Sequence, residues 1–470
     1  MAESDSENRK HSLSRRGLLK TGGAAAVTGL AGCTQGGGGS EDTPTAEETM
    51  ATATTAMGSP EPEEVTVEFW PAWGGYYEET FTEMISRFEE KHPNITVEMT
   101  AQGSYRESKS ALFNAANAGN PPDIGQLDKG EAIIARDSGF FTPVEDIWPD
   151  INPDEYLGSA MGSSIIEGTI WSVPWNNSQI VMYYNKDHFE AAGLDPEQPP
   201  DTWDEFSNAA NTIVEEGVAD FGVTWPNHSW WIHSWMAELE SFVCNQENGR
   251  AGEPDEVMYD NDAAQRIFDF WMNDLGDAYH NPGQEDWGSS EQAFQNEVAS
   301  MHMNSSGSIA YSLPGFEEND INVGVTGLPV PEERIGHPMG GAAVWVTDKD
   351  RTQAEREGIK TFLEEMTGPE LQAFYSKQTG YFASHQGSFD VLDEQGFYDE
   401  HADTFNQAPE QLMAWEETPY NKGILMGPFS KITKEVAVQS DKILQGKSID
   451  DGLSDLKDFG DRELERYERT

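Results

Sequence analysis

The sequence is poor in basic residues and in cysteine. Among 470 residues, 84 acidic side chains stand against 29 basic ones, which gives a formal net charge of −55. A nucleic-acid binder of the usual kind is excluded, because phosphate backbones are held by clusters of lysine and arginine. The two cysteines, Cys33 and Cys244, lie too far apart in the sequence for a C-x-x-C metal or redox site. We predict that Cys244 is a small buried apolar residue.

The common enzyme motifs are missing as well. The sequence contains no G-x-S-x-G, H-E-x-x-H, G-x-x-x-x-G-K-[ST] or G-x-G-x-x-G pattern, and no D-x-[DN]-x-[DN]-G calcium loop. We therefore expect no enzymatic activity, no cofactor and no metal site. Carboxylates are so numerous that a catalytic pair cannot be singled out, which leaves a secreted glycoside hydrolase as an alternative.

The chain nevertheless has enough apolar material to fold. Hydrophobic residues make up 37% and aromatic residues 11% of the sequence, more than an acidic disordered chain contains. The acidic surplus favours a salt-adapted (halophilic) surface, because the Debye length falls to about 3 Å at molar salt and neighbouring carboxylates then repel little. An acidic secreted protein from an ordinary environment is the alternative.

The first 33 residues predict an export signal. Ser14–Lys20 reads SRRGLLK and resembles a twin-arginine signal, a short apolar run follows, and Leu30–Cys33 reads LAGC, which resembles a lipobox. We predict export by the twin-arginine route and a lipid on Cys33 that anchors the mature chain to the outer face of the cytoplasmic membrane. Residues 34–63, rich in Gly, Thr, Glu and Pro, predict a flexible linker.

Strand and helix patterns alternate after the linker. Alternating apolar residues predict strands, and apolar residues spaced by three or four predict helices. The predicted elements are a strand over 65–70, a helix over 76–91, a strand over 95–99, a helix over 105–118, a strand from 124, a strand over 180–184, a helix over 203–216, strands over 221–224, 321–325 and 342–346, and a mostly helical tail over 354–469. This order predicts an α/β fold with a largely parallel sheet.

Aromatic residues stand beside small polar ones in four stretches. These are WPAWGG at 70–75, WNNS at 175–178, WPNHSWW at 225–231 and NSSGS at 304–308. An aromatic face surrounded by hydroxyls and amides is typical of sites that bind small polar solutes. Packing in the core is the alternative for each tryptophan.

One long run of motifs points to a known family. Between Tyr183 and Trp203 the chain reads YYNKD, AGLDP and PPDTW in order, and further matching runs lie at 303–308, 340–346, 378–381 and 394–398. On these motifs, residues 65 to about 455 resemble extracellular solute-binding proteins, of the sugar-binding family, that serve ABC importers. The resemblance implies ABC permease subunits as partners, with a lipid as the only contact with the membrane, and we expect a monomer.

The resemblance also implies the architecture. It predicts a bilobed, periplasmic-binding-protein-like α/β fold, with two α/β lobes, a hinge and a ligand cleft between them, which closes on its ligand by hinge motion. We place lobe one at about 64–176 plus 307–346, and lobe two at about 177–306 plus 347–470.

The ligand contacts of the glycerol-phosphate-binding members of that family carry over by motif. They fall on Tyr105, Ser178, Ser305, Gly341 and Tyr381. Either of two adjacent tryptophans, Trp230 or Trp231, is the expected aromatic platform.

Two further positions depart from the family pattern. Lys129 stands where the family has Glu, and Thr433 stands where it has Arg, the natural partner of a phosphate. Two interpretations of the ligand follow. In the first, Lys129 or Lys431 supplies the positive charge, and the ligand is glycerol-3-phosphate or a glycerophosphodiester. In the second, the ligand is a neutral sugar or polyol.

Overall fold

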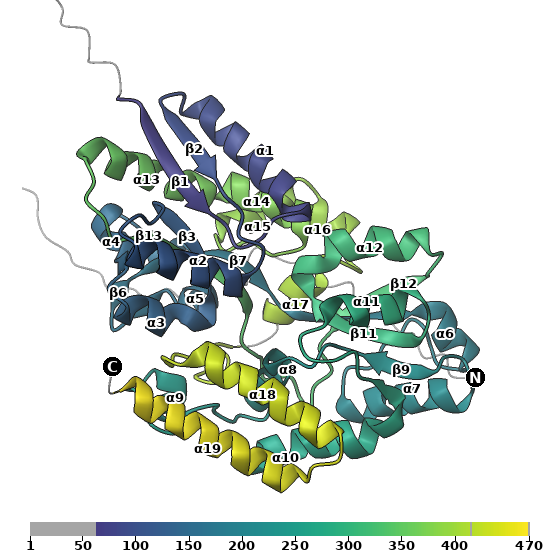
Figure 1. Ribbon diagram of the computed structural model, residues 1–470. Helices are drawn as coiled ribbons and strands as arrows, with labels where there is room; N and C mark the ends of the chain where they lie inside the picture. Colours follow the sequence, from purple (N-terminus) through teal and green to yellow (C-terminus); the bar gives the residue numbers. More distant parts are fainter. Residues whose placement is uncertain (1–62, 414–415, 469–470) are drawn as a thin grey trace, which may run out of the picture. The chain divides into compact units, whose positions relative to one another are not determined.

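Two β-sheets organise the chain in the computed structural model, which describes residues 63–413 and 416–468 (Figure 1). The predicted export signal at 1–33, and the predicted linker at 34–63 except for its last residue, lie outside the described residues. None of the helices in the described part combines the length and the apolar character needed to cross a membrane.

The first sheet has the strand order β2-β1-β3-β13-β4, and β7 also pairs with β13. Its strands are β1 (Val65–Trp70), β2 (Ile95–Met99), β3 (Ile124–Asp128), β4 (Phe141–Thr142), β7 (Ser172–Ser178) and β13 (Gly340–Thr347). Strand β1 runs parallel to β2 and β3, whereas β13 runs antiparallel to β3, β4 and β7.

The second sheet has the strand order β10-β9-β11-β8-β12. Its strands are β8 (Ile180–Asn185), β9 (Phe221–Thr224), β10 (Tyr279–His280), β11 (Ala299–Ser305) and β12 (Val323–Gly327), and a separate pair is formed by β5 (Ile165–Ile166) and β6 (Thr169–Ile170). Strand β9 runs parallel to β10 and β11, but β8 runs antiparallel to β11 and β12. The prediction of a largely parallel sheet is therefore wrong. The chain crosses from one sheet to the other before β8 and again before β13, and each of these two strands runs antiparallel to its neighbours in the sheet it joins.

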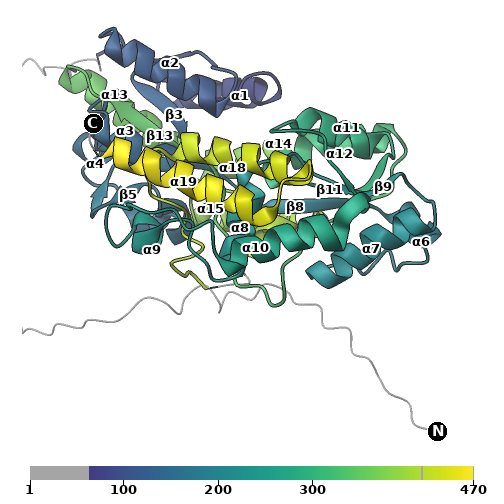
Figure 2. The same ribbon diagram turned by 60° about the horizontal axis from the view of Figure 1, so that its bottom comes forward.

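Helices cover both sheets. Those packed around the first sheet are α1 (Tyr76–Lys91), α2 (Tyr105–Asn117), α3 (Ala132–Asp137), α4 (Val144–Ile147), α5 (Gly158–Met161), α13 (Gln353–Met366) and α14 (Pro369–Thr379), with α15 (Gly387–Glu394) and α16 (Phe397–Glu400) following on α14. Those around the second sheet are α6 (Lys186–Ala191), α7 (Trp203–Glu215), α8 (Ser229–Glu238), α9 (Asn245–Gly249), α10 (Asp262–Asp269), α11 (Trp287–Gln295), α12 (Ile309–Glu318), α17 (Gln407–Met413), α18 (Phe429–Leu444) and α19 (Ile449–Tyr467). The yellow helices α18 and α19 lie side by side, next to α10 (Figures 1 and 2).

Several local predictions are confirmed. The predicted strand over 65–70, helix over 76–91 and strand over 95–99 coincide with β1, α1 and β2. One face of α1 is buried, including Phe81 and Phe88, and the helix ends before His92-Pro93 because proline disfavours a helical residue in front of it. Cys244 lies in the core of the second sheet, as predicted, and burial raises the pKa of its thiol to about 12.

The predicted division of the two lobes needs two corrections. Residues 307–346 were expected in lobe one, but β12 is hydrogen-bonded to β8 of the second sheet. Residues 347–470 were expected in lobe two, but Ile359 and Phe362 of α13 lie in the same apolar core as β1. The motifs identify these segments but carry no information on their long-range strand and helix partners.

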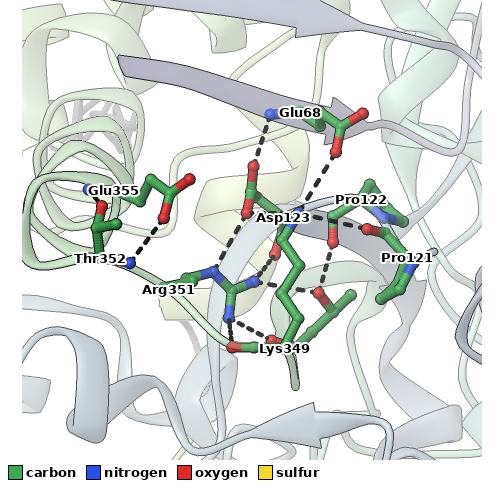
Figure 3. A network of polar contacts seen from close by, with 9 residues as sticks. Glu68, Pro121, Pro122, Asp123, Lys349, Arg351, Thr352 and Glu355 are labelled. Carbon is green, nitrogen blue, oxygen red and sulfur yellow. Dashed lines mark hydrogen bonds and ion pairs between the residues drawn. The ribbon is translucent and has the colours of Figure 1, made fainter. Parts of the chain in front are cut away.

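A buried carboxylate joins α13 to the first sheet (Figure 3). Asp123, just before β3, accepts the backbone N–H of Glu68 on Oδ2 at 3.0 Å and contacts Arg351 Nε through Oδ1 at 3.2 Å. Arg351 also donates to the carbonyl of Thr347 at 2.8 Å, and its side chain is 2% exposed. The start of α13 is thereby held at the end of β13, where Thr352 and Glu355 form its capping box.

Replacing Arg351 with methionine should lower the free energy of unfolding by about 3 to 5 kcal/mol, because the buried carboxylate of Asp123 would lose its buried cationic partner. Lys349→Met is the matched control. The Lys349 amine also contacts Asp123, at 3.0 Å, but its side chain is 28% exposed, so we expect a loss of about 1 kcal/mol or less. Denaturant titration of both variants measures the difference, and equal losses would contradict the role given to Arg351.

Candidate functional site

Three stretches of chain pass side by side between the two sheets. The middle one joins β7 to β8 through the single residue Gln179. On one side, Asn177 pairs with Gly341 of β13, and on the other it forms a bridge to Phe382, which follows α14. Most of the predicted ligand contacts lie on or beside these three stretches.

Three residues form a row across the strands at this point. Ala342 pairs with both Asp128 and Asn176, so the next position along brings Lys129, Gly341 and Asn177 into line. Gly341 has φ +115°, and a Cβ on it would lie 2.0 Å from the carbonyl oxygen of Asn176. Only glycine fits here.

Lys129 reaches across this glycine. It opens the short helix η1 (Lys129–Glu131), and its amine donates a hydrogen bond to Oδ1 of Asn177. Burial lowers the pKa of the amine to about 7, although the neighbouring Asp128 carboxylate opposes the shift. Burial also raises the pKa of Asp128 to about 6, while the N–H of Gly130, 2.8 Å from its Oδ1, works in the other direction. The pair thus titrates close to neutral pH.

Tyr105 lies at the start of α2, where Ser104 caps the helix. Its hydroxyl accepts a hydrogen bond from Nδ2 of Asn176 at 2.9 Å, and Asn176 in turn accepts one from Nε2 of Gln126 at 2.8 Å. Burial raises the pKa of Tyr105, so the hydroxyl stays protonated. The Trp73 ring packs edge-on against it, with the centroids 5.1 Å apart.

Tyr381 and Ser305 are brought together by Gly307. A Cβ on Gly307 would lie 2.5 Å from the Tyr381 ring, and its N–H donates to Oγ of Ser305 at 3.1 Å. The hydroxyl of Tyr77 donates to the carbonyl of Gly307 at 2.8 Å. Tyr381 stacks on Tyr375 at 5.9 Å, so its ring is fixed in an aromatic cluster.

The structure distinguishes the two candidate platform tryptophans. A Cβ on Gly340 would lie 2.8 Å from both Oγ of Ser178 and the ring of Trp230, so these two residues meet over this glycine. Trp230 is partly exposed. Trp231 is fully buried in the core of the second sheet, and its Nε1 donates to the carbonyl of Pro226 at 2.6 Å. The geometry therefore favours Trp230 over Trp231 for ligand contact.

Helix α18 reaches the same region from the second sheet. A Cβ on Gly130 would lie 2.1 Å from the ring of Phe429, and Thr433 follows one turn later on the same helix face. Lys431 faces elsewhere. Its amine pairs with Glu463 at 3.0 Å, and its side chain is 68% exposed.

Two asparagines and two aromatic residues belong to this region although the sequence did not single them out as contacts. Asn176 and Asn177 hold Tyr105 and Lys129, and Trp73 and Tyr77 complete the aromatic cluster. The stretches WNNS and WPAWGG drew attention to three of the four. Which side chain each amide meets depends on pairing across strands, which a single sequence does not reveal.

Two surface hollows lie elsewhere. One of about 330 Å³ is lined by residues of α10 and α19, and one of about 440 Å³ lies between the end of α7 and the start of β11. Neither contains a predicted contact residue. Within residues 63–413 and 416–468, no group of three His, Cys, Asp or Glu side chains is placed to hold a metal ion.

Comparison with known proteins agrees with this architecture. The chain is 27% identical over 428 residues to the sn-glycerol-3-phosphate-binding periplasmic protein UgpB of Escherichia coli K12, covering 86% of this chain and 94% of the relative. It also resembles the structure of UgpB from Mycobacterium tuberculosis in complex with glycerophosphocholine, with a TM-score of 0.71 and 19% identity, over 88% of this chain and 100% of that one. The GacH receptor of Streptomyces glaucescens, solved unliganded and with acarbose, gives a TM-score of 0.71 and 19% identity, over 85% and 98%.

A family model settles the relationship that the motifs predicted. Residues 74–373 match the model described as bacterial extracellular solute-binding protein. The two-lobed α/β fold is the fold of the solved relatives, which confirms the predicted fold class. The chain belongs to the family of bacterial extracellular solute-binding proteins.

Proposed function

We propose that this protein is the lipid-anchored substrate-binding protein of an ABC importer, and that it captures glycerol-3-phosphate or a glycerophosphodiester outside the membrane for delivery to the permease. The relatives support this proposal, since the E. coli relative is named for sn-glycerol-3-phosphate and the M. tuberculosis one was solved with glycerophosphocholine. They are binding proteins, which supports a role without catalysis. A secreted glycoside hydrolase would release the chromophore from a chromogenic glycoside, and we expect no release.

The position of Lys129 is the observation that favours a phosphate-containing ligand over a neutral sugar. Its amine is partly buried, and its hydrogen-bond partner is the neutral amide of Asn177. Burying an ammonium group without an anionic hydrogen-bond partner is costly, which is why its pKa falls. An anionic group bound beside the amine would offset that cost. Lys129 therefore replaces the missing arginine at Thr433, whereas Lys431 is already paired with Glu463.

A neutral sugar or polyol is the second candidate. It is favoured by the partly exposed ring of Trp230 beside Ser178, an arrangement that suits the apolar face and hydroxyls of a sugar. In both cases the proposed contacts are Tyr105, Lys129, Ser178, Trp230, Ser305, Gly341, Tyr381 and Thr433.

Replacing Lys129 with alanine should weaken a phosphate-containing ligand at least tenfold, which corresponds to about 1.4 kcal/mol, because the ammonium would be its cationic partner. Binding of a neutral sugar should stay nearly unchanged. Titration calorimetry with glycerol-3-phosphate, glycerophosphocholine and maltose, in high salt, measures both effects. Lys431→Ala is the matched control, since it removes the same charge from an exposed, already paired lysine.

The outcomes separate the two candidates. Absence of heat with both phosphate compounds, together with binding of maltose, would reject the phosphate ligand. Equal losses in Lys129→Ala and Lys431→Ala would show that net charge rather than a local contact controls affinity.

The affinity for a glycerophosphodiester should fall as the pH rises above 7. Below its pKa of about 7 the Lys129 amine already carries its proton and adds no further pH dependence, so any change there comes from Asp128, whose pKa is about 6. Above the pKa of Lys129, binding must take up a proton, and affinity should drop by up to about tenfold per pH unit. The diester keeps a single charge throughout, so its own titration does not interfere. In Lys129→Arg, which is always charged, the profile from about pH 7 to 9 should be flat, and a flat wild-type profile over that range would contradict the proposal.

We also propose that the protein is anchored through Cys33 after twin-arginine export, with residues 34–63 as the linker. Cys33→Ser should move the mature protein from the membrane fraction into the medium, because one residue would carry the whole lipid attachment. Immunoblots of the two fractions measure the shift. Cys244→Ser, at the buried cysteine, is the control and should stay with the membrane; retention of Cys33→Ser would contradict the anchor.

A further inference from the structure

Gln179 has a side-chain amide without a partner in the described part of the chain. The residue is fully buried, yet neither Nε2 nor Oε1 makes a hydrogen bond there. No other side-chain amide among residues 63–413 and 416–468 is buried with both atoms unpartnered. A buried amide that gives up water without gaining a partner is unfavourable, so this one calls for an explanation.

Nearby buried glutamines show the ordinary arrangement. Gln126 accepts the N–H of Ala72 at 2.8 Å and donates to Asn176 at 2.8 Å. Gln372 accepts the N–H of Ser384 at 3.2 Å and donates to the carbonyl of Met366 at 3.2 Å. The fold therefore satisfies buried amides at comparable positions, and Gln179 is an exception.

The backbone of Gln179 is held in place within the candidate site. Its N–H donates to Oγ of Ser306 at 3.2 Å, and its carbonyl accepts the N–H of Ser306 at 2.8 Å. The residue stands directly between Ser178 and β8, while Ser306 directly follows Ser305. One proposed ligand contact, Ser178, thus directly precedes Gln179 in the chain, and another, Ser305, directly precedes its backbone partner Ser306.

The direction of the strand places the side chain on the side of Lys129. Side chains alternate along an extended chain, so Gln179 lies on the face of Asn177 and opposite to Ser178. Asn177 uses its Oδ1 to accept from Lys129 and its Nδ2 to donate to Ser384 at 2.8 Å. Both polar atoms of the Asn177 side chain therefore already have partners, and Asn177 does not satisfy the side-chain amide of Gln179.

We propose that the carboxamide of Gln179 is a further ligand-binding group of this site, which pairs with a hydroxyl of the glycerol or sugar moiety. A carboxamide offers one acceptor and two donors, and a hydroxyl both donates and accepts, so the two groups match. Phosphate oxygens only accept and would leave Oε1 unpaired. This inference rests on the site proposed above, but it holds for a phosphate ester and for a neutral sugar alike.

Gln179→Met tests the inference because methionine has a similar shape and no hydrogen-bonding group. The variant should raise the denaturant midpoint of the ligand-free protein, since an unpaired amide is removed, and should weaken binding of glycerophosphocholine at least tenfold. Gln372→Met is the matched control and should lower the midpoint, because it leaves two partners unpaired.

The two readouts distinguish this inference from the proposed function. A midpoint that fails to rise in Gln179→Met, including a variant that does not fold, would show that the amide does not destabilise the ligand-free protein, and would overturn the inference whatever the ligand is. If the wild type binds only maltose, the phosphate proposal fails, and the affinity comparison is made with maltose. An affinity within twofold of the wild type overturns the inference; a higher midpoint with weaker binding supports it.

Discussion

The close passage of β13 beside β7 at Gly341 is the constraint on which the site depends. A side chain at this position would collide with the carbonyl of Asn176, because a Cβ would lie 2.0 Å from that oxygen. Because Gly341 has no side chain, the amine of Lys129, which directly follows β3, reaches Asn177 of β7 on the other side of β13. The backbone geometry of one glycine therefore decides where the cation of the site can lie.

The chain also crosses between the lobes just before this point. The segment before β13 is fixed to the second sheet by Glu238, whose Oε2 accepts the N–H groups of Ile335 and Gly336 at 2.7 and 3.0 Å, and whose Oε1 lies 2.9 Å from Nδ1 of His337. The side chains of Glu238 and His337 are completely buried. Because Glu238 holds this segment to the second lobe and β13 belongs to the first sheet, the chain passes from one lobe to the other between His337 and Gly340.

Local patterns predicted the elements well, and distant partners poorly. The spacing of apolar residues and the break at His92-Pro93 gave α1 its observed limits, because both signals lie within the helix itself. The assignment of 307–346 to lobe one holds for β13 but failed for β12, because β12 pairs with β8, more than a hundred residues earlier. Trp230 and Trp231 are adjacent in sequence, and only the fold shows that one is buried in the core. The unpartnered amide of Gln179 leaves no trace in the sequence at all.

The negative charge of the whole chain bears on the role of Lys129. A net charge of −55 repels an anionic solute at long range, but salt screens that field beyond about 8 to 10 Å. Over shorter distances the local partners decide, and Lys129 is partly withdrawn from solvent, where screening is weaker. A neutral sugar gains little from an ammonium group whose pKa has already fallen to about 7. An anion gains a direct partner and restores the proton of the amine, so the energetic cost of keeping this lysine between the lobes favours an anionic ligand.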